Sequence, residues 1–414
     1  MIMDVFCGID WAEDHHDIAL TDRDGTLLAR RRISDDAAGL ASLLALLAEY
    51  GDTAEDPVPV AIETPRGLLT ACLRATGRPV YPVNPKAVAR YRDRHSVAGR
   101  KSDHGDSFVL ASVLRTDMHA HRPLPADSEL AQAIAVLARA QQDAVWDRTT
   151  AHNKLRSHLR EYFPGFLAAF AGARDGIMRP EARIILAAAP APADAARLTL
   201  AQLRALLKKA GRQRGIDKEA QRLREAFRAV QMRQLPLVEQ AMGRQALALL
   251  GQLDAACASA ADLEHATVES FNLHPDAGII TSFPGLGALT GARVLAETGD
   301  DRSRFQDAKS LKAYAGAAPI TRASGKTRSV THRKVKNNRL ASAGYNWAFS
   351  ALTASPGARR HYDRRRDTGD GHPAAQRNLF GRLLGCLHKC LATGQHYDES
   401  IAFPDTPKKP SQAA

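Results

Sequence analysis

Four carboxylates stand at places in the sequence where a folded sheet could bring them together. Asp10 ends the first short apolar run of the chain, and Glu63 ends a second one at residues 58–62. Asp103 and Asp106 are three residues apart at the start of an expected helix, so they share one helix face. A buried carboxylate needs a cation or hydrogen bonds, because an unpaired charge is costly to bury. Carboxylate oxygens are the ligands that Mg²⁺ or Mn²⁺ prefers, so these residues predict a divalent metal site.

Ser324 is the second candidate for chemistry, because it stands in a basic segment. We expect it in a flexible Ser-Gly turn, flanked by Arg322, Lys326 and Arg328. A hydroxyl among cations can attack a phosphodiester, since the cations stabilise charge on the phosphoryl oxygens. Basic Ser-Gly loops also contact backbone phosphate without doing chemistry, and the sequence leaves both interpretations open.

A Pro-Gly-Leu-Gly turn at residues 284–287 leads into an apolar helical segment, which is the pattern of a helix-hairpin-helix. The backbone amides of Gly285 and Gly287 could then approach a phosphate, which the N-terminus of the following helix attracts. A plain corner between two helices fits the same pattern.

Positive charge is concentrated in the C-terminal part of the chain. Residues 316–390 contain 15 Lys and Arg against 3 Asp, an excess equal to the formal net charge of +12 for all 414 residues. A basic region beside a neutral remainder predicts a polyanion partner, most simply nucleic acid. A solvated basic surface is the alternative. The residues expected to contact nucleic acid are Gly285, Gly287, Arg322, Lys326, Arg328, Arg333, Lys334, Lys336 and Arg339.

The elements that must position the carboxylates form an α/β region over residues 1–126. Its segments predict three strands in hairpin succession, followed by alternating helices and strands. This is the element order of an RNase H-like (RuvC-like) mixed sheet flanked by helices, with Asp10 on the central first strand. The expected strands are 5–8, 17–21, 26–33, 58–62 and 80–83; the expected helices are 37–50 and one from about 67, with a basic loop before residue 101.

The rest of the chain is expected to be mainly helical. Residues 127–275 show helical stripes, a capping box at Thr199 and Gln202, and a hinge at 187–196. A long helical pair around an insertion predicts either a coiled coil for dimerisation or an α-helical subdomain. Residues 276–403 are the expected C-terminal domain, and residues 404–414 are the expected disordered tail.

Other candidate metal ligands have simpler explanations. The five cysteines are scattered without CxxC spacing, and there is no secretory leader pattern or long apolar run, so we expect a cytosolic protein with reduced thiols and no membrane span. Cys386, His388 and Cys390 lie in a leucine-rich helical segment, which favours core thiols. His15 and His16 are adjacent and point to opposite faces of a strand, so at most one could reach the carboxylates, and we assign neither.

Taken together, the motifs resemble the insertion-sequence 110 family of transposases, the DEDD type with a RuvC-like N-terminal domain. The resemblance covers nearly the whole chain and rests on the order and spacing of its parts: Gly8-Ile9-Asp10, Ala61-Ile62-Glu63, Asp103-His104-Gly105-Asp106, the turn at 283–287 and the segment 315–326. It implies that Asp10, Glu63, Asp103 and Asp106 form a metal-binding tetrad, and that Ser324 is the nucleophile of a C-terminal transposase domain.

The resemblance also implies partners and a reaction. Members of the family excise and insert a mobile element by a recombinase-like pathway, and some are guided by a structured bridge RNA that pairs with target and donor DNA. Their active site combines the tetrad of one subunit with the serine of another, so a homodimer or homotetramer is expected. The implied location is the bacterial cytoplasm, on the nucleoid when active.

Three rival interpretations are open. A Holliday-junction resolvase also uses four carboxylates in this fold, although such enzymes are shorter and lack the serine domain. An actin-like ATPase shares the fold, and Asp367-Thr368-Gly369-Asp370-Gly371 imitates a phosphate loop, but no apolar strand precedes it. The third rival is an inactive DNA-binding protein derived from a transposase.

Overall fold

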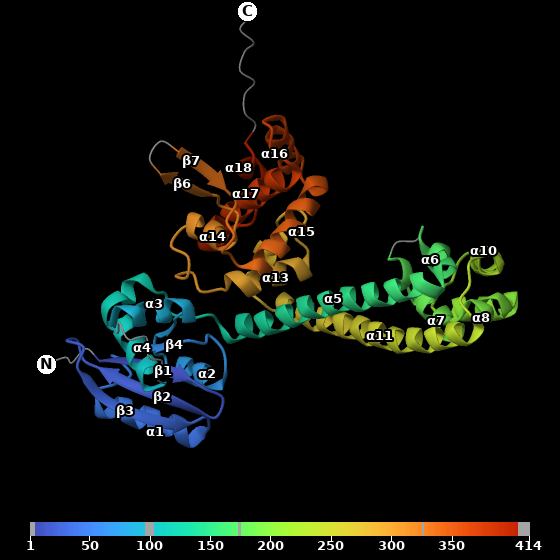
Figure 1. Ribbon diagram of the computed structural model, residues 1–414. Helices are drawn as coiled ribbons and strands as arrows, with labels where there is room; N and C mark the ends of the chain where they lie inside the picture. Colours follow the sequence, from blue (N-terminus) through green and yellow to red (C-terminus); the bar gives the residue numbers. More distant parts are fainter. Residues whose placement is uncertain (1–4, 96–102, 173–174, 325–326, 405–414) are drawn as a thin grey trace, which may run out of the picture. The chain divides into compact units, whose positions relative to one another are not determined.

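The computed structural model describes residues 5–95, 103–172, 175–324 and 327–404. The side chains of residues 93–95, 103, 104, 322, 327 and 328 lie outside the description, and so does the predicted tail from residue 405 onward. The chain forms two compact units, Met1–Ala126 and Asp127–Ala414 (Figure 1). The further division of the second unit at residue 275 stays a prediction.

The first unit is built on a mixed five-stranded sheet with helices on its faces, an arrangement compatible with an RNase H-like fold. The strand order is β3-β2-β1-β4-β5, which confirms the predicted central position of the first strand. The pairs β1–β2 and β2–β3 are antiparallel, whereas β1–β4 and β4–β5 are parallel. The strands are β1 (Phe6–Trp11), β2 (His15–Thr21), β3 (Leu27–Ser34), β4 (Val60–Ile62) and β5 (Val80–Pro82).

Alternation along β1 divides its side chains between the two faces of the sheet. Cys7 and Ile9 are buried in a core with α1 (Ala37–Glu49) and α2 (Leu68–Ala75). The opposite face carries a second core that α4 (Asp103–Asp117) builds with β4, β5 and α3 (Pro85–His95). Gly8 and Asp10 therefore belong to the face that α4 covers.

The predicted basic loop before residue 101 contains a helix, α3, which corrects the expectation. The Asn84 side chain accepts a hydrogen bond from the amide of Lys86 at 2.9 Å, and the Asn84 carbonyl accepts the amide of Val88 at 3.1 Å. Val88 is fully buried and Tyr91 packs beside it against α4. Lys86 and Arg90 are exposed on this helix, and its apolar face is too narrow to stand out in the sequence.

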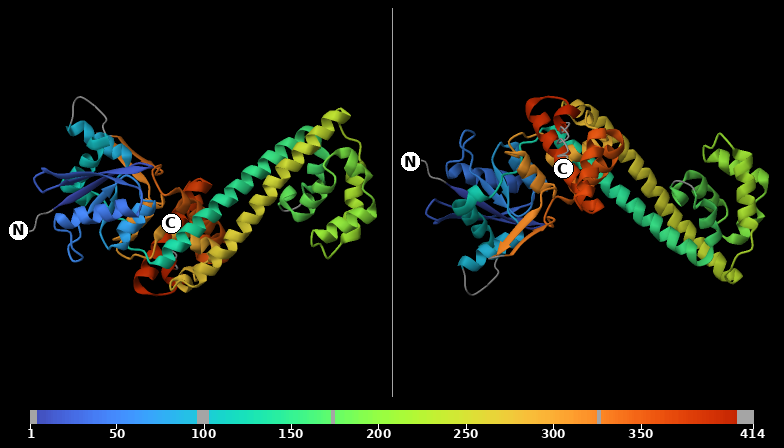
Figure 2. Two further views of the ribbon diagram at one scale, coloured as in Figure 1. Left: turned by 90° about the horizontal axis from the view of Figure 1, so that it is seen from below. Right: turned by 90° about the horizontal axis from the view of Figure 1, so that it is seen from above.

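The second unit contains a long helical pair, α5 (Glu129–Tyr162) and α11 (Pro236–Asn272), which lie side by side (Figure 2). Among the described residues, five short α-helices and the 3-10 helix Gly176–Met178 connect their far ends and enclose a separate core of aromatic and leucine side chains. The predicted long helical pair around an insertion is thus present, and its use in dimerisation stays a prediction. Among the described helices, α11 alone is long and apolar enough to span a membrane by length and composition, a test that core helices also pass. The connecting helices are α6 (Pro164–Phe170), α7 (Pro180–Ala188), α8 (Pro192–Arg197), α9 (Leu200–Lys209) and α10 (Ile216–Arg228).

Two local predictions for this region have different outcomes. The capping box of α9 is confirmed, because the Thr199 hydroxyl and the Gln202 side chain each bond the backbone amide of the other residue. The predicted hinge at 187–196 is wrong in part. It is the tight junction of α7 and α8, where Ala189 and Ala191 are buried and Pro192 begins the second helix.

The C-terminal part of the second unit packs around Trp347, whose ring meets Phe283 and Phe380 edge-on at centroid distances of 5.6 and 6.1 Å. It is mainly helical, as predicted, but it also contains a β-hairpin that the sequence analysis missed. The elements are α12 (Ala277–Thr281), α13 (Ala288–Thr298), α14 (Ala308–Tyr314), β6 (Ile320–Ser324), β7 (Thr327–Thr331), α15 (Asn338–Ala354), α16 (Pro356–Asp367), α17 (His372–Thr393) and α18 (Glu399–Ala402). Cys386 and Cys390 pack against this core, as predicted.

Candidate active site

The parallel register of β1 and β4 brings two of the predicted carboxylates to one edge of the sheet. Ile9 pairs with Ile62 in two neighbouring strands that run in the same direction, so the next residues are Asp10 on β1 and Glu63 directly after β4. Both side chains are half-buried there. The apolar runs that precede them form the buried part of each strand, which is why the polar residue falls at the end.

Gly8 brings the third carboxylate to this edge, because it lets α4 approach the sheet closely. A Cβ atom on Gly8 would lie 2.0 Å from the backbone oxygen of Ser107 and 2.4 Å from the backbone nitrogen of Ala111. No side chain larger than hydrogen fits between β1 and α4 at this point. The close approach places Asp106, on the turn of α4 that touches Gly8, beside the end of β1.

Asp10, Glu63 and Asp106 line one cavity of about 450 Å³ in the first unit. Asp106 is 4% exposed and forms an ion pair with Arg92 of α3. The oxygen that faces Arg92 is Oδ1, and this buried atom has the ion pair but no hydrogen bond in the described part of the chain. The backbone of Asp103 begins α4 one turn before Asp106, but the Asp103 side chain lies outside the description.

The donor set fits a hard divalent cation. Asp10, Glu63 and Asp106 line one cavity, and carboxylate oxygens are the ligands that such a cation prefers. A bound cation would share the Asp106 carboxylate with Arg92. No group of three or more His, Cys, Asp or Glu side chains within the described residues is already arranged closely enough to hold a metal. The Asp103 carboxylate, which lies outside the described side chains, is the expected fourth ligand.

The cavity lining also includes three titratable side chains that the sequence did not predict there: His15, Asp17 and Arg92. Asp17 lies directly across from Asp10 in the antiparallel pair and accepts two hydrogen bonds from Arg32, at 3.0 and 2.8 Å. His15 shares this face by period-two alternation, whereas the adjacent His16 is fully buried and bonds Asp35. The alternation was a usable signal for His15 and Asp17. The sequence contained no comparable signal for Arg92, because α3 was not predicted.

Ser324 is the last residue of β6, where it pairs with Thr327 across the hairpin, and its side chain is exposed. The serine therefore ends a paired strand directly before the two-residue connection of the hairpin, and the predicted flexibility of that turn stays a prediction. Lys326 lies in that connection, outside the described residues, and the side chains of Arg322 and Arg328 are also outside the description.

The two glycines of the predicted helix-hairpin-helix differ in their surroundings. Gly285 has a φ of +73°, and a Cβ atom on it would lie 2.6 Å from the backbone nitrogen of Ala351 in α15. This glycine is required by packing between the turn and α15. Gly287 caps α13, and the space around its Cα is open. Contact with a phosphate stays a prediction for both.

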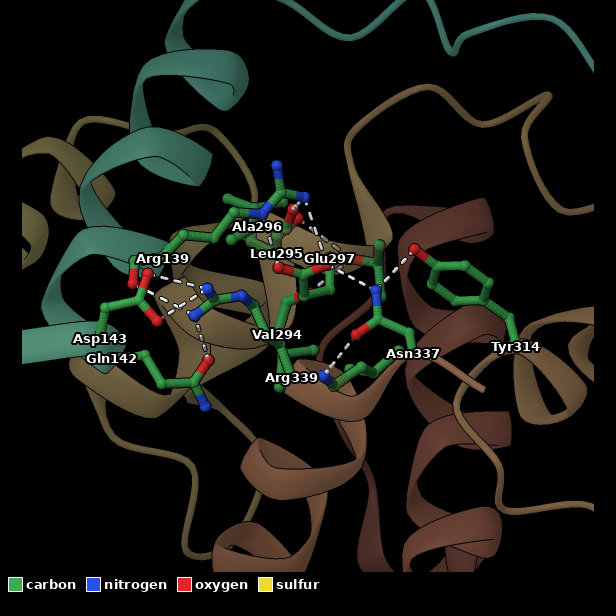
Figure 3. Close-up of polar contacts among 12 residues, drawn as sticks. Arg139, Gln142, Asp143, Val294, Leu295, Ala296, Glu297, Tyr314, Asn337 and Arg339 are labelled. Atoms are coloured by element: carbon green, nitrogen blue, oxygen red, sulfur yellow. Dashed lines mark hydrogen bonds and ion pairs between the residues drawn. The ribbon is translucent and has the colours of Figure 1, made fainter. Parts of the chain in front are cut away.

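Arg339 has an intramolecular role that the predicted phosphate contact did not anticipate. Its Nη2 donates to both carboxylate oxygens of Asp143 at 2.8 Å, and its Nη1 donates to the Gln142 side chain at 3.2 Å (Figure 3). The guanidinium also lies 5.1 Å from the ring centroid of Trp146. These contacts, made across nearly 200 positions of sequence to α5, occupy the group that was expected to bind phosphate.

The remaining basic residues of this segment precede α15. Lys334 is exposed, whereas Arg333 and Lys336 are half-buried. The aliphatic part of Lys336 covers Gly316, where a Cβ atom would lie 2.1 Å from the lysine Cδ. Of this group, the side chain of Lys334 is therefore the most accessible to a polyanion.

Comparison with known proteins identifies the class of molecule. One family model described as a transposase, of the DEDD type named for IS110, matches residues 7–164, and another, described as the transposase IS116/IS110/IS902 family, matches residues 277–363. The chain is 63% identical over 399 residues to the mini-circle putative transposase for IS117 of Streptomyces coelicolor, with 96% of each chain covered. It is 29% identical over 411 residues to the insertion element IS900 uncharacterized 42 kDa protein of Mycobacterium paratuberculosis, covering 98% of this chain and 99% of the relative. It is 30% identical over 397 residues to the insertion element IS116 uncharacterized 44.8 kDa protein of Streptomyces clavuligerus, with 94% of each chain covered.

The protein is thus a DNA transposase, a class of enzyme that binds and recombines DNA. Its sequence matches both family models in the expected order along the chain, and the relatives cover almost its full length. The chain belongs to the IS110 family of transposases.

Proposed function

We propose that this transposase cuts and rejoins DNA with two sets of groups, the carboxylates of an RNase H-like first unit and the Ser324 hydroxyl of the second. The observation that carries the proposal is the single cavity that Asp10, Glu63 and Asp106 line at the end of β1 and β4. Such a cavity suits phosphoryl transfer, because its oxygen ligands can hold the cations that this chemistry needs.

Asp10, Glu63 and Asp106, together with Asp103, would hold Mg²⁺ or Mn²⁺. When bound, such ions neutralise charge on the phosphoryl oxygens and on the leaving oxygen. The protein's own groups do the rest. Arg92 already contacts Asp106 and can contribute positive charge toward a scissile phosphate in the same cavity.

Ser324 would be the nucleophile that attacks the DNA. Its side chain is exposed at the end of a paired strand, which fixes the backbone while leaving the hydroxyl accessible. Attack forms a bond between Oγ and phosphorus, breaks the bond to the deoxyribose oxygen, and transfers the hydroxyl proton to a base or water. The phosphoester keeps the bond energy for religation, as strand exchange requires.

The partners follow from the same proposal. The DNA partners would be the element ends and the target, and the family resemblance adds a structured bridge RNA and a homodimer or homotetramer in which subunits share the two sets of groups. A bacterial insertion element is the setting of such a reaction, which supports the expected cytoplasmic location.

The test is to trap the reaction on nicked duplex DNA that carries an element end, and to look for a denaturant-resistant protein–DNA adduct. We expect the adduct in the parent and its loss in Ser324→Ala. Ser329→Ala changes an exposed serine on the other strand of the same hairpin and should keep the adduct. An undiminished adduct in Ser324→Ala would refute the assignment of the nucleophile.

The carboxylates are tested in the same assay. Asp10→Asn should abolish cleavage in Mg²⁺ while DNA binding persists, whereas Glu55→Gln, an exposed residue of the same unit, should cleave like the parent. Cleavage that requires Asp10 but never produces an adduct would favour the resolvase-type alternative. DNA binding without any metal-dependent cleavage would favour an inactive DNA-binding protein.

A further inference from the structure

A second cavity, in the C-terminal part of the second unit, is lined by positive side chains. It has a volume of about 370 Å³ and lies between α16, α17 and the end of the described chain. Its basic lining consists of Arg360, Arg364 and Arg382, which we call the arginine cavity. All three side chains are exposed, so a ligand from solvent can reach them. None of these residues was assigned a function from the sequence.

The arginines of α16 fall into two groups according to their partners. Arg359 donates to both oxygens of Asp363, at 3.0 and 2.9 Å, and the Arg365 guanidinium pairs with Asp370 at 2.7 Å. Arg364, in contrast, forms no ion pair with any carboxylate in the described ranges, and the same holds for Arg382 of α17. Among the charges that face the cavity, those of Arg364 and Arg382 are therefore not neutralised by an acid of the described ranges.

The polar contacts of these two arginines hold them without cancelling their charge. The Arg382 Nε donates to the backbone carbonyl of Ala402 at 2.8 Å, and the Arg364 Nη2 lies 3.2 Å from His361 Nδ1. The other ring nitrogen of His361 lies 2.8 Å from the Asn378 side-chain oxygen. Both contacts are satisfied when His361 is neutral with its proton on Nε2.

The protonation of His361 agrees with this arrangement. Burial lowers the pKa of the imidazole, and the nearby guanidinium groups of Arg364, Arg382 and Arg365 lower it further. The positive charge at the cavity thus comes from arginines, which stay charged at every pH at which a protein is folded.

We propose that the arginine cavity binds one backbone phosphate of DNA, at a site separate from the carboxylates and from Ser324. Arg360 and Arg364 are four residues apart and share one side of α16, and Arg382 approaches from α17. Guanidinium groups that line one cavity can donate paired hydrogen bonds to the two non-bridging oxygens of a phosphodiester. A bound anion would also relieve the repulsion among like charges, which no carboxylate relieves at Arg364 and Arg382.

The proposal rests on the protein's binding of DNA and not on the serine chemistry. It is tested with the full chain by fluorescence anisotropy on duplex DNA over a range of salt concentrations, without divalent metal, so that no strand is cut. The variant is the double substitution Arg364→Gln and Arg382→Gln. Its matched control is Arg359→Gln with Arg366→Gln, which removes the same charge from exposed positions of α16 outside the cavity.

We expect the cavity variant to bind more weakly and its log–log salt slope to fall by about one unit, because one phosphate contact is lost. The control pair should keep the parental slope. Equal effects of the two doubles, or no effect of either, would overturn the proposal. A loss confined to an RNA hairpin of similar length, with duplex DNA binding unchanged, would also overturn it.

A single substitution guards against a folding defect in the double variant. Arg364→Lys keeps the charge but removes the planar fork, so it should weaken binding less than the double while leaving the thermal midpoint unchanged. If Arg364→Lys and the cavity double both bind DNA like the parent, the site does not exist. Failure of adduct formation in the Ser324 assay would leave this result unaffected.

Discussion

Glu297 provides the most direct test of how the second unit is held together. This glutamate of α13 is 3% exposed, and its carboxylate accepts hydrogen bonds from Arg139 Nε at 2.7 Å and from Asn337 Nδ2 at 2.6 Å (Figure 3). Arg139 belongs to α5, and Asn337 caps α15. One buried carboxylate therefore ties together three helices that are far apart in the sequence. Arg139→Met removes its positive partner and leaves only the neutral amide.

The expected loss of stability follows from the burial of the two groups. Removing one partner of a buried ion pair costs about 3–5 kcal/mol, and an exposed pair contributes at most ~1 kcal/mol. The Glu297 side chain is buried, but that of Arg139 is 35% exposed, so water can partly replace the guanidinium. We therefore expect Arg139→Met to lower the free energy of unfolding by about 2–3 kcal/mol, between the two limits.

A second substitution separates the charge effect from packing. In Arg139→Met with Glu297→Leu no charge is left buried, so stability should return to within about 1 kcal/mol of the parent. Asn337 would keep its hydrogen bond to the Tyr314 hydroxyl at 2.7 Å. The measurement is urea unfolding followed by tryptophan fluorescence, with the slope checked for two-state behaviour. A single variant as stable as the parent, or a double variant less stable than the single, would refute the reasoning.

Two further predictions concern the first unit. Gly8→Ala places a methyl group against the backbone of α4, so we expect the free energy of unfolding in urea to fall by about 1–3 kcal/mol and metal-dependent cleavage to be lost as Asp106 moves. Gly251→Ala, in open space on α11, should leave cleavage unchanged and raise stability by about 0.5–1 kcal/mol, because alanine favours a helix more than glycine does. Parental cleavage by Gly8→Ala would contradict the assigned role of the close contact. Burial raises the pKa of the Cys7 thiol to about 12, so at pH 8 this thiol stays protonated and shielded from reagents. A disulfide reagent should therefore react with at most four of the five cysteines in the folded protein and with all five in denaturant. Cys7→Ser should lower the number of reactive thiols in denaturant and leave the number in the folded protein unchanged. If Cys7→Ser also lowered the number of thiols that react in the folded protein, the Cys7 thiol would be accessible.

Short-range patterns in the sequence were enough to locate most of the carboxylate site. Asp10 follows an apolar run in which Cys7 and Ile9 are buried, and its place at the end of that run predicts a carboxylate at the end of a buried strand. The polar residue at the end of each apolar run also predicts that Asp10 and Glu63 meet, because parallel strands end at the same edge. Thr199 and Gln202 could be recognised in the same way, since a helix cap involves residues only three apart.

What only the tertiary structure decided is which partner each charged side chain has. In the sequence, Arg339 and Arg364 are alike members of a basic region, yet Arg339 bonds Asp143 of α5, whereas Arg364 faces a cavity beside Arg382. The same limit applies to Arg92, which pairs with Asp106 from α3, a helix that was not predicted because its charged residues outnumber its apolar ones. The spacing of apolar residues within one strand or helix involves neighbours in the sequence, so it can be recognised from the sequence alone. The neutralisation of a charge depends on groups that packing brings together from distant positions, so the sequence alone predicts a polyanion partner but not which arginines contact it.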